Sequence, residues 1–81
     1  MVVTAYNERF VGGLADNLRR ERKQAGLTQR ALAERAGLTE LTILKIERGQ
    51  ERNPKLRTIR RLARALEVSY DRLIPPPDET L

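Results

Sequence analysis

The sequence TQRALAERAGLTELTILKIE, residues 28–47, decides the fold of this chain. Ala33 has the small side chain that two short helices require where they cross closely. Gly37 tolerates the positive φ of a turn between them because it has no Cβ atom. Thr28 and Thr39 stand where a side-chain oxygen could cap each helix start. Four apolar residues are expected to anchor the second helix: Leu32, Leu38, Ile43 and Ile46. The pattern predicts two helices joined by a sharp turn.

The opposite face of the second helix carries none of these anchoring residues. A helix-turn-helix unit presents its recognition helix to a DNA major groove in this way. The alternative is a plain helical hairpin whose small residues serve packing alone, and the spacings by themselves leave it open. The flanking sequence argues against the hairpin. We therefore expect a DNA-reading unit at about residues 29–48.

Helical patterns flank this unit on both sides. Before it, apolar residues recur on one helix face: Phe10, Val11, Leu14, Ala15 and Leu18. Gly12 and Gly13 weaken that helix, and Gly26 is placed to end it. Its basic residues off the stripe are expected to form a solvated face: Arg19, Arg20 and Lys23. After the unit, a fourth helix has an apolar stripe: Leu56, Ile59, Leu62, Ala63 and Leu66. A short fifth helix is expected to open at Ser69 and to stop at Pro75.

These patterns predict an all-α chain with one compact five-helix domain. The domain spans residues 10–74, and its helix-turn-helix is formed by helices two and three. Residues 1–9 are expected to be a frayed N-terminal segment, and residues 75–81 a Pro-rich acidic tail. The chain has neither a strand pattern nor an internal repeat.

Composition limits the chemistry of the chain. Its 81 residues include no Cys and no His, so neither a disulfide nor a zinc site of the usual kind is expected. It lacks an apolar run long enough to cross a membrane and a signal-peptide pattern, so we expect a cytoplasmic protein with no membrane partner. With one Ser and no glycine-rich phosphate loop as well, enzyme activity and a cofactor are not expected.

The charge distribution favours a polyanionic partner. Residues 1–67 contain fifteen Lys and Arg against eight Asp and Glu, whereas residues 68–81 contain one against three. Basic solubilised surfaces are common, so charge alone is weak evidence. One Phe, two Tyr and no Trp provide no aromatic platform for single-stranded bases. The expected partner is double-stranded DNA.

Three segments resemble the phage-repressor-like helix-turn-helix family, of the Cro/C1 or Xre type. They are LRRERKQAGLTQRALAERAGL, TILKIERG and RNPKLRTIRRLARALEVSYDRLI, and the resemblance covers about residues 14–74. It implies a lambda-repressor-like five-helix domain. In size the chain most resembles the small controller proteins of restriction–modification systems, with Cro-like repressors and antitoxins as close rivals. It departs from the family at Glu67, where Gly is frequent, at Lys55, where Ser is frequent, and in a longer loop after Gly49.

The resemblance implies that Glu40, Leu41 and Lys45 face base edges. Glu accepts a hydrogen bond from cytosine N4, Lys donates to guanine O6 or N7, and Leu packs on a thymine methyl group. Each residue also has a simpler interpretation. Glu40 could serve only as a helix-dipole partner, Lys45 as a solvated charge or phosphate contact, and Leu41 as a partly buried packing residue.

Six further residues are expected to contact the DNA backbone: Gln29, Thr39, Thr42, Arg48, Arg52 and Lys55. By resemblance, the Gln29 amide and the helix N-terminus meet one phosphate. The alternatives are a polar residue at a helix start for Gln29 and a generic basic loop for the cations. Arg22 and Glu47 look like an internal ion pair of the family that orients the recognition helix.

A symmetric dimer contact is implied by resemblance for five apolar residues: Leu66, Val68, Tyr70, Leu73 and Ile74. Closure of the core is the alternative for some of them. A dimer would read a palindrome, because one recognition helix contacts too few base pairs for useful specificity.

The expected function is therefore that of a homodimeric transcriptional regulator on a palindromic operator. RNA polymerase is a further candidate partner, since Glu34 could belong to an acidic contact patch, although Arg30 argues against it. The alternative is an antitoxin of the same fold that binds and silences another protein, for which the acidic tail could serve.

Overall fold

The computed structural model describes residues 13–74, and it places four α-helices and one short 3₁₀ helix along this part of the chain. The elements are α2 (Gly13–Gln24), α3 (Gln29–Ala36), α4 (Glu40–Glu47), α5 (Leu56–Leu66) and η1 (Tyr70–Arg72). None of the described residues is in a strand, so the predicted all-helical class is confirmed. The predictions for residues 1–9 and 75–81, and the apolar positions Phe10 and Val11, lie outside the described residues.

The prediction of five α-helices is not confirmed within residues 13–74, because the expected fifth helix is a single 3₁₀ turn at Tyr70–Arg72. Ser69 before it is extended, with φ −73° and ψ 157°. The following Pro75 disfavours the helical region for Ile74. The extended Ser69 and the proline after Ile74 therefore restrict the helical segment to about one turn, and 3₁₀ geometry is common in such short segments.

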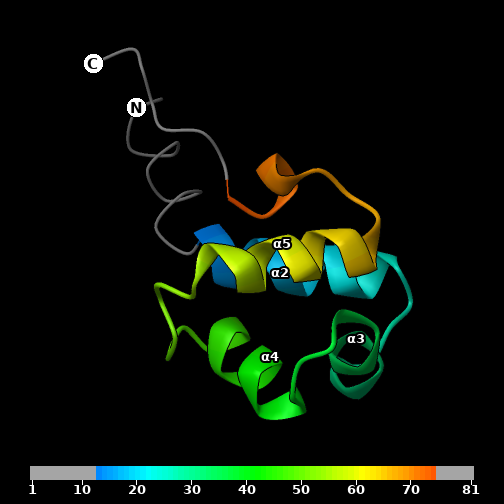
Figure 1. Ribbon diagram of the computed structural model, residues 1–81, viewed down its shortest axis with the longest axis horizontal. Coiled ribbons are helices and arrows are strands. Elements are labelled where there is room, and N and C mark those ends of the chain that lie inside the picture. Colours follow the sequence, from blue (N-terminus) through cyan, green and yellow to red (C-terminus); the bar gives the residue numbers. More distant parts are fainter. Residues whose placement is uncertain (1–12, 75–81) are drawn as a thin grey trace.

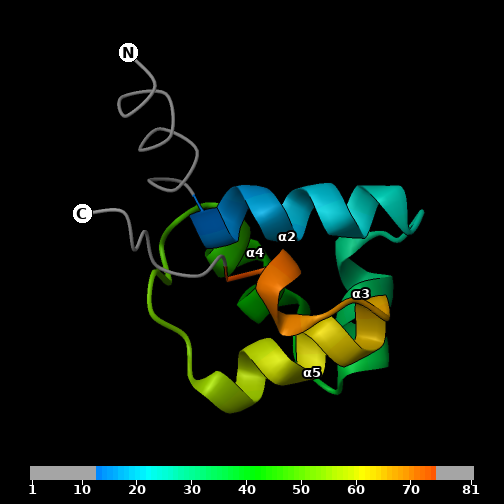
Figure 2. The same ribbon diagram turned by 90° about the horizontal axis from the view of Figure 1, so that it is seen from above.

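The helices form two layers. In Figure 1, α2 and α5 lie above α3 and α4, and η1 lies on the side away from α3 and α4. Figure 2, seen from above, shows α2 and α5 on opposite sides of the molecule. α4 packs against α3 and α2, while α3 also packs against α5. The helix-turn-helix pair is therefore held by both helices of the other layer.

The core takes large apolar side chains from α2, α3, α4 and α5 and from the residue that follows η1. Its fully buried members are Leu18, Leu32, Ile43, Ile46, Leu62 and Leu73. Leu38 is partly buried and packs against this cluster. The four expected anchors of the recognition helix thus all contribute to the core, as predicted. None of the described helices is long and apolar enough to span a bilayer.

Local hydrogen bonds set the ends of α3 and α4 as the sequence predicts. The Thr28 side chain accepts from the backbone N–H of Ala31 at 3.0 Å. Thr39 accepts from Thr42 N–H at 3.2 Å. Gly37 has φ 70°, and the N–H of the next residue, Leu38, donates back across the turn to Ala33 O at 2.9 Å. These bonds satisfy helix-end groups that would otherwise lack partners.

The end of α5 has the same geometry although it lacks glycine. Glu67 adopts φ 58° and ψ 42°, while Val68 N–H donates to Ala63 O at 3.0 Å and Glu67 N–H to Arg64 O at 3.1 Å. The family departure at Glu67 therefore leaves the shape of the cap intact and adds strain to it, since a side chain disfavours this conformation. At the other end of α5, Lys55 makes no side-chain cap bond.

Two polar contacts attach the η1 region to α2. Asn17 Nδ2 donates to Leu73 O at 3.0 Å, and Arg72 pairs with the buried carboxylate of Glu21, with its Nη2 3.0 Å from Glu21 Oε2. The partners in these contacts are 56 and 51 positions apart in the sequence, and neither contact was predicted.

Candidate DNA interface

One face of α4 is exposed and carries the three predicted base-reading residues. Glu40 and Lys45 are exposed, and Leu41 has 55% of its surface accessible. Ile43 and Ile46 turn the opposite side of the helix into the core. More than half of the Leu41 surface is thus available for a contact outside residues 13–74. We name Glu40, Leu41 and Lys45 the recognition face.

The start of α4 presents two linked hydroxyl groups beside the recognition face. Thr39 Oγ1 lies 2.9 Å from Thr42 Oγ1, and it also accepts the backbone bond that caps the helix. One hydroxyl donates to the other, so the proton of the accepting hydroxyl is available for an outside acceptor. A phosphate oxygen is an acceptor of this kind.

The buried carboxylate of Glu47 links α4 to both α3 and α2. Glu47, the last residue of α4, is 4% exposed. Arg22 binds it in a bidentate manner, with Nε 2.7 Å from Oε2 and Nη2 3.1 Å from Oε1. The Gln29 Nε2 group donates to the same Oε1 at 3.1 Å. Charge-assisted bonds of this geometry are strong and directional. We name Arg22, Gln29 and Glu47 the Glu47 network.

Two more arginine contacts extend the network to the backbone. Arg22 Nη1 donates to Leu27 O at 2.8 Å, and Arg19 Nη2 donates to Glu47 O at 2.7 Å. Arg19 was expected on a solvated face, and this expectation is corrected, since its guanidinium satisfies a carbonyl at the end of α4. Arg20 and Lys23 are exposed, as predicted.

Gln29 is the first residue of α3, so the network joins the start of one helix to the end of the next. Its Nε2 group has a second N–H that the Glu47 contact does not use. The amide is therefore oriented while it keeps donor and acceptor capacity for a ligand at the α3 N-terminus.

The loop between α4 and α5 carries the other predicted backbone contacts. Arg48, Arg52 and Lys55 are all exposed. Gly49 has φ 76°, and Gln50 N–H donates to Lys45 O at 2.8 Å, so the chain turns sharply as it leaves α4. Figure 1 shows this loop at one end of the molecule.

The five predicted dimer residues divide into two groups. Leu73 has no exposed surface and Leu66 has 7%, so both are core residues, and their assignment to a subunit interface is corrected. The short η1 turn brings Leu73 back onto the body of the domain and buries it there. Val68 and Ile74 are partly buried, and Tyr70 is 37% exposed. These three of the five predicted dimer residues keep accessible surface, and we name them the η1 surface.

Comparison with known proteins places this geometry in a family. Residues 18–73 match the family model described as helix-turn-helix. The chain belongs to this helix-turn-helix family. The match covers α3, α4 and α5, and it begins inside α2.

Similar proteins carry the name of HTH-type transcriptional regulator. An uncharacterized HTH-type transcriptional regulator of Sinorhizobium fredii is 40% identical over 67 residues, which are 83% of this chain and 86% of the relative. Another, from Methanothermobacter thermautotrophicus, is 49% identical over 49 residues, 60% of this chain and 70% of the relative. The HTH-type transcriptional regulator SinR of Bacillus licheniformis is 30% identical over 67 residues, 83% of this chain and 60% of that protein. The chain is thus a transcriptional regulator with a helix-turn-helix DNA-binding domain.

Sequence reasoning missed Arg19 and the Glu21–Arg72 pair in this helix-turn-helix domain. One signal for Arg19 was available, because it precedes Arg22 by three positions and so lies on the same side of the helix. For Glu21 and Arg72, which are 51 positions apart, the sequence offers no comparable local signal.

Proposed function

We propose that this chain is a sequence-specific, double-stranded DNA-binding transcriptional regulator that acts as a homodimer on a palindromic operator and catalyses no reaction. The Glu47 network carries the proposal, because it orients Gln29 and the exposed side of α4 together. A phosphate held at Gln29 would thereby set the position of the recognition face against the bases.

Each residue of the recognition face has a partner chemistry in the major groove. Lys45 would donate to guanine O6 or N7, Glu40 would accept from cytosine N4, and Leu41 would cover a thymine methyl group. The 55% exposure of Leu41 supports the last assignment, because an apolar side chain left in water gains most from such a contact.

The sequence-independent share of the affinity comes from the DNA backbone. In this proposal six residues contact phosphates: Gln29, Thr39, Thr42, Arg48, Arg52 and Lys55. The cations among them release counterions on binding, so the affinity falls steeply as the salt concentration rises.

Dimer formation is supported by the η1 surface. Tyr70, Val68 and Ile74 remain at least partly accessible after the core has closed. A two-fold dimer would place two recognition faces about one helical turn apart on DNA. As the subtype we propose a controller of a restriction–modification system, on the sequence resemblance, which would block or recruit RNA polymerase at its operator.

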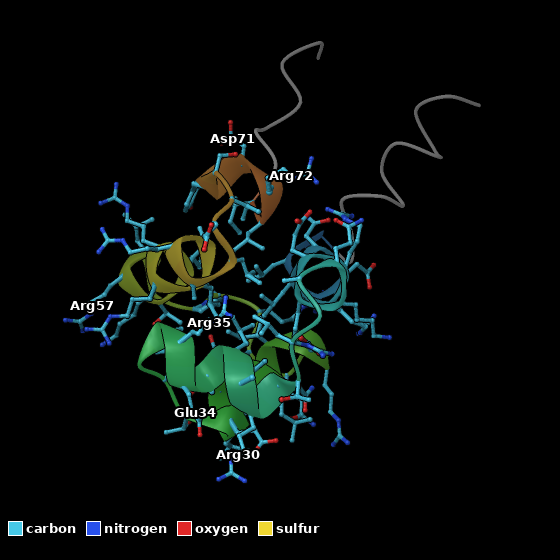
Figure 3. The ribbon with its side chains drawn as sticks, turned by 90° about the vertical axis from the view of Figure 1, so that its right-hand side faces the viewer. Arg30, Glu34, Arg35, Arg57, Asp71 and Arg72 are labelled. Atoms are coloured by element: carbon cyan, nitrogen blue, oxygen red, sulfur yellow. The ribbon has the colours of Figure 1, made fainter. Side chains whose placement is uncertain are left out.

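A direct contact of Glu34 with polymerase is not supported. Arg30 Nε lies 3.5 Å from Glu34 Oε2, and Figure 3 shows both side chains on the outer side of α3. The neighbouring cation offsets the acidic character of that position.

The test is selection of bound duplexes from a random pool at physiological salt, followed by sequencing. Enrichment of a two-fold-symmetric site is the expected result. A single half-site would keep the DNA-reading role and refute the dimer. Uniform, salt-sensitive binding to all sequences would refute specific regulation and favour the alternative, a partner-silencing protein such as an antitoxin.

A matched pair of variants separates base contacts from backbone contacts. Lys45→Ala should relax the preference at one position of the enriched site, at a cost of about 1–3 kcal/mol for the preferred base. Arg52→Ala should weaken binding to all sequences alike. Equal losses on every sequence for both variants would show that Lys45 contacts only phosphate.

A further inference from the structure

The outer side of α5 carries a stripe of arginines that the proposed function does not use. Arg57, Arg60, Arg61 and Arg64 follow the spacing of a single helix face, and all four are exposed. The buried side of α5 is formed by other residues: Ile59, Leu62, Ala63 and Leu66. Figure 3 shows Arg57 pointing away from α2. We name the four arginines the α5 arginine face.

These guanidinium groups have no acidic partners within residues 13–74. None of the ion pairs found among the described residues includes them. Arg61 makes one long hydrogen bond, from Nη1 to Gly37 O at 3.4 Å. Arg35 of α3 lines one surface hollow together with Arg61 and Arg64, and Glu67 is the one acidic residue among the described residues that line it, so three cations there face one carboxylate. Like charges at these spacings oppose each other, so the stripe does not stabilise the isolated domain.

An apolar side chain lies within the same face. Leu56, at the start of α5, is 51% exposed and lines a second shallow hollow together with all four arginines. None of the recognition-face residues lines either hollow. A ligand of the α5 arginine face would therefore leave Glu40, Leu41 and Lys45 free.

The exposed Leu56 among the arginines indicates which kind of polyanion fits this face best. A guanidinium fork matches a carboxylate in a bidentate manner, and the stems of arginine side chains pack against apolar groups. A DNA backbone provides phosphates but little apolar surface to cover a leucine. An acidic protein segment with an apolar side chain provides both.

We propose that the α5 arginine face binds an acidic segment of a partner protein. Carboxylates of that segment pair with Arg57, Arg60 and Arg64, and one of its apolar side chains covers Leu56. Because this surface is distinct from the recognition face, the partner binds whether or not DNA occupies α4. The inference therefore does not depend on the operator proposed above.

The test uses two fluorescein-labelled peptides and a DNA duplex, with binding followed by fluorescence anisotropy. The first peptide alternates pairs of Glu with Leu, and the second has Ser in place of each Leu. The α5 variant is Arg57→Gln with Arg60→Gln and Arg64→Gln. Its control removes the same number of positive charges, three, from the segment after α4. The control substitutions are Arg48→Gln, Arg52→Gln and Lys55→Gln.

We expect the α5 variant to bind the Leu-containing peptide about tenfold more weakly and the duplex almost normally, because truncating a close charge pair is costly only at its own interface. The loop variant should show the opposite pattern. Leu56→Ser, which changes an exposed side chain and leaves the core intact, should weaken binding of the Leu-containing peptide and leave binding of the Ser-containing peptide unchanged.

Three results would overturn the proposal. Equal weakening of peptide binding by both triple variants would mean general charge attraction. Weakening of duplex binding by the α5 variant as large as that of the loop variant would make the face a DNA surface. Unchanged peptide binding by the α5 variant would exclude the site. Failure of the wild-type protein to bind any duplex would count against the proposed function alone, because the peptide measurements contain no DNA.

Discussion

At the scale of single residues, Glu47 links the stability of the fold to the position of a proposed DNA contact, Gln29. Its buried carboxylate accepts from Arg22 and Gln29, which belong to two different helices. A buried ion pair adds little net stability when it is intact, but removal of one partner leaves an uncompensated charge. The network is therefore best understood as an orienting device whose loss is costly.

Glu47→Gln should lower the free energy of unfolding by about 3 kcal/mol, since the largely covered side chain of Arg22 loses its counter-ion. Urea denaturation measures this change. DNA affinity should also fall at protein concentrations where the variant is folded, because Gln29 loses the carboxylate that orients it. Arg30→Ala is the control, because its exposed pair with Glu34 should be worth no more than about 0.5 kcal/mol. Similar losses in the two variants would refute a special role for Glu47.

At the scale of secondary-structure elements, α3 and α4 are better capped than α5. Threonine hydroxyls cap both α3 and α4. In contrast, the N-cap residue of α5, Lys55, makes no side-chain bond, and its C-cap residue, Glu67, is a non-glycine residue in the left-handed region. The two ends of α5 are thus places where stability can be gained without any change of fold.

Glu67→Gly should stabilise the domain by about 1 kcal/mol, because glycine adopts φ 58° without the strain of a side chain. Such a gain corresponds to a rise in Tm of roughly 4–8 °C for a domain of this size. Thermal unfolding followed by circular dichroism measures it. Glu67→Ala removes the charge but keeps the strain, so it should show little of the gain. Equal effects of the two substitutions would attribute the change to the carboxylate.

Lys55→Ser should change stability and DNA binding in opposite directions. A serine at this extended position can cap α5, which is typically worth about 1 kcal/mol. Loss of the cation should reduce the slope of log affinity against log salt by about 0.9, the value of one phosphate contact. Lys55→Gln separates the effects, since it removes the charge without adding a hydroxyl. An unchanged salt slope in both variants would place Lys55 away from the DNA backbone.

At the scale of the whole molecule, the η1 turn determines which apolar residues face outward. It buries Leu73, attaches to α2 through the pair of Arg72 and Glu21, and leaves Tyr70 accessible. In a domain this small, dimerisation would both extend the hydrophobic core and double the number of base contacts.

Tyr70→Glu should prevent formation of the proposed dimer, because it places a charge in the proposed contact while the core residues stay unchanged. Sedimentation equilibrium measures the molecular mass, and titration of a palindromic site should show affinity falling to that of a half-site. Leu56→Ala, which changes an exposed apolar residue on α5, serves as the control and should stay dimeric. A Tyr70→Glu protein that remains dimeric would place the subunit contact elsewhere.

The sequence by itself determined the helix-turn-helix. Its turn depends on Gly37 and its helix starts on Thr28 and Thr39, and each of these forms bonds with residues at most a few positions away. Local chemistry of this kind can be inferred from spacing, as can the apolar stripe that buries Ile43 and Ile46. The exposure of the recognition face then followed from helical periodicity. The Arg22–Glu47 pair was also predicted, although only through the family resemblance.

Only the tertiary structure decided which distant groups meet. Arg19 satisfies a carbonyl 28 positions away, and Arg72 pairs with a carboxylate 51 positions away. The tertiary structure also decided that Leu66 and Leu73 are core residues, because an apolar side chain suits a core and an interface equally well. Periodicity defines the faces of each helix, but the packing of all the helices determines whether a given face is covered. The contacts of buried charges and the division between core and surface therefore had to come from the folded molecule.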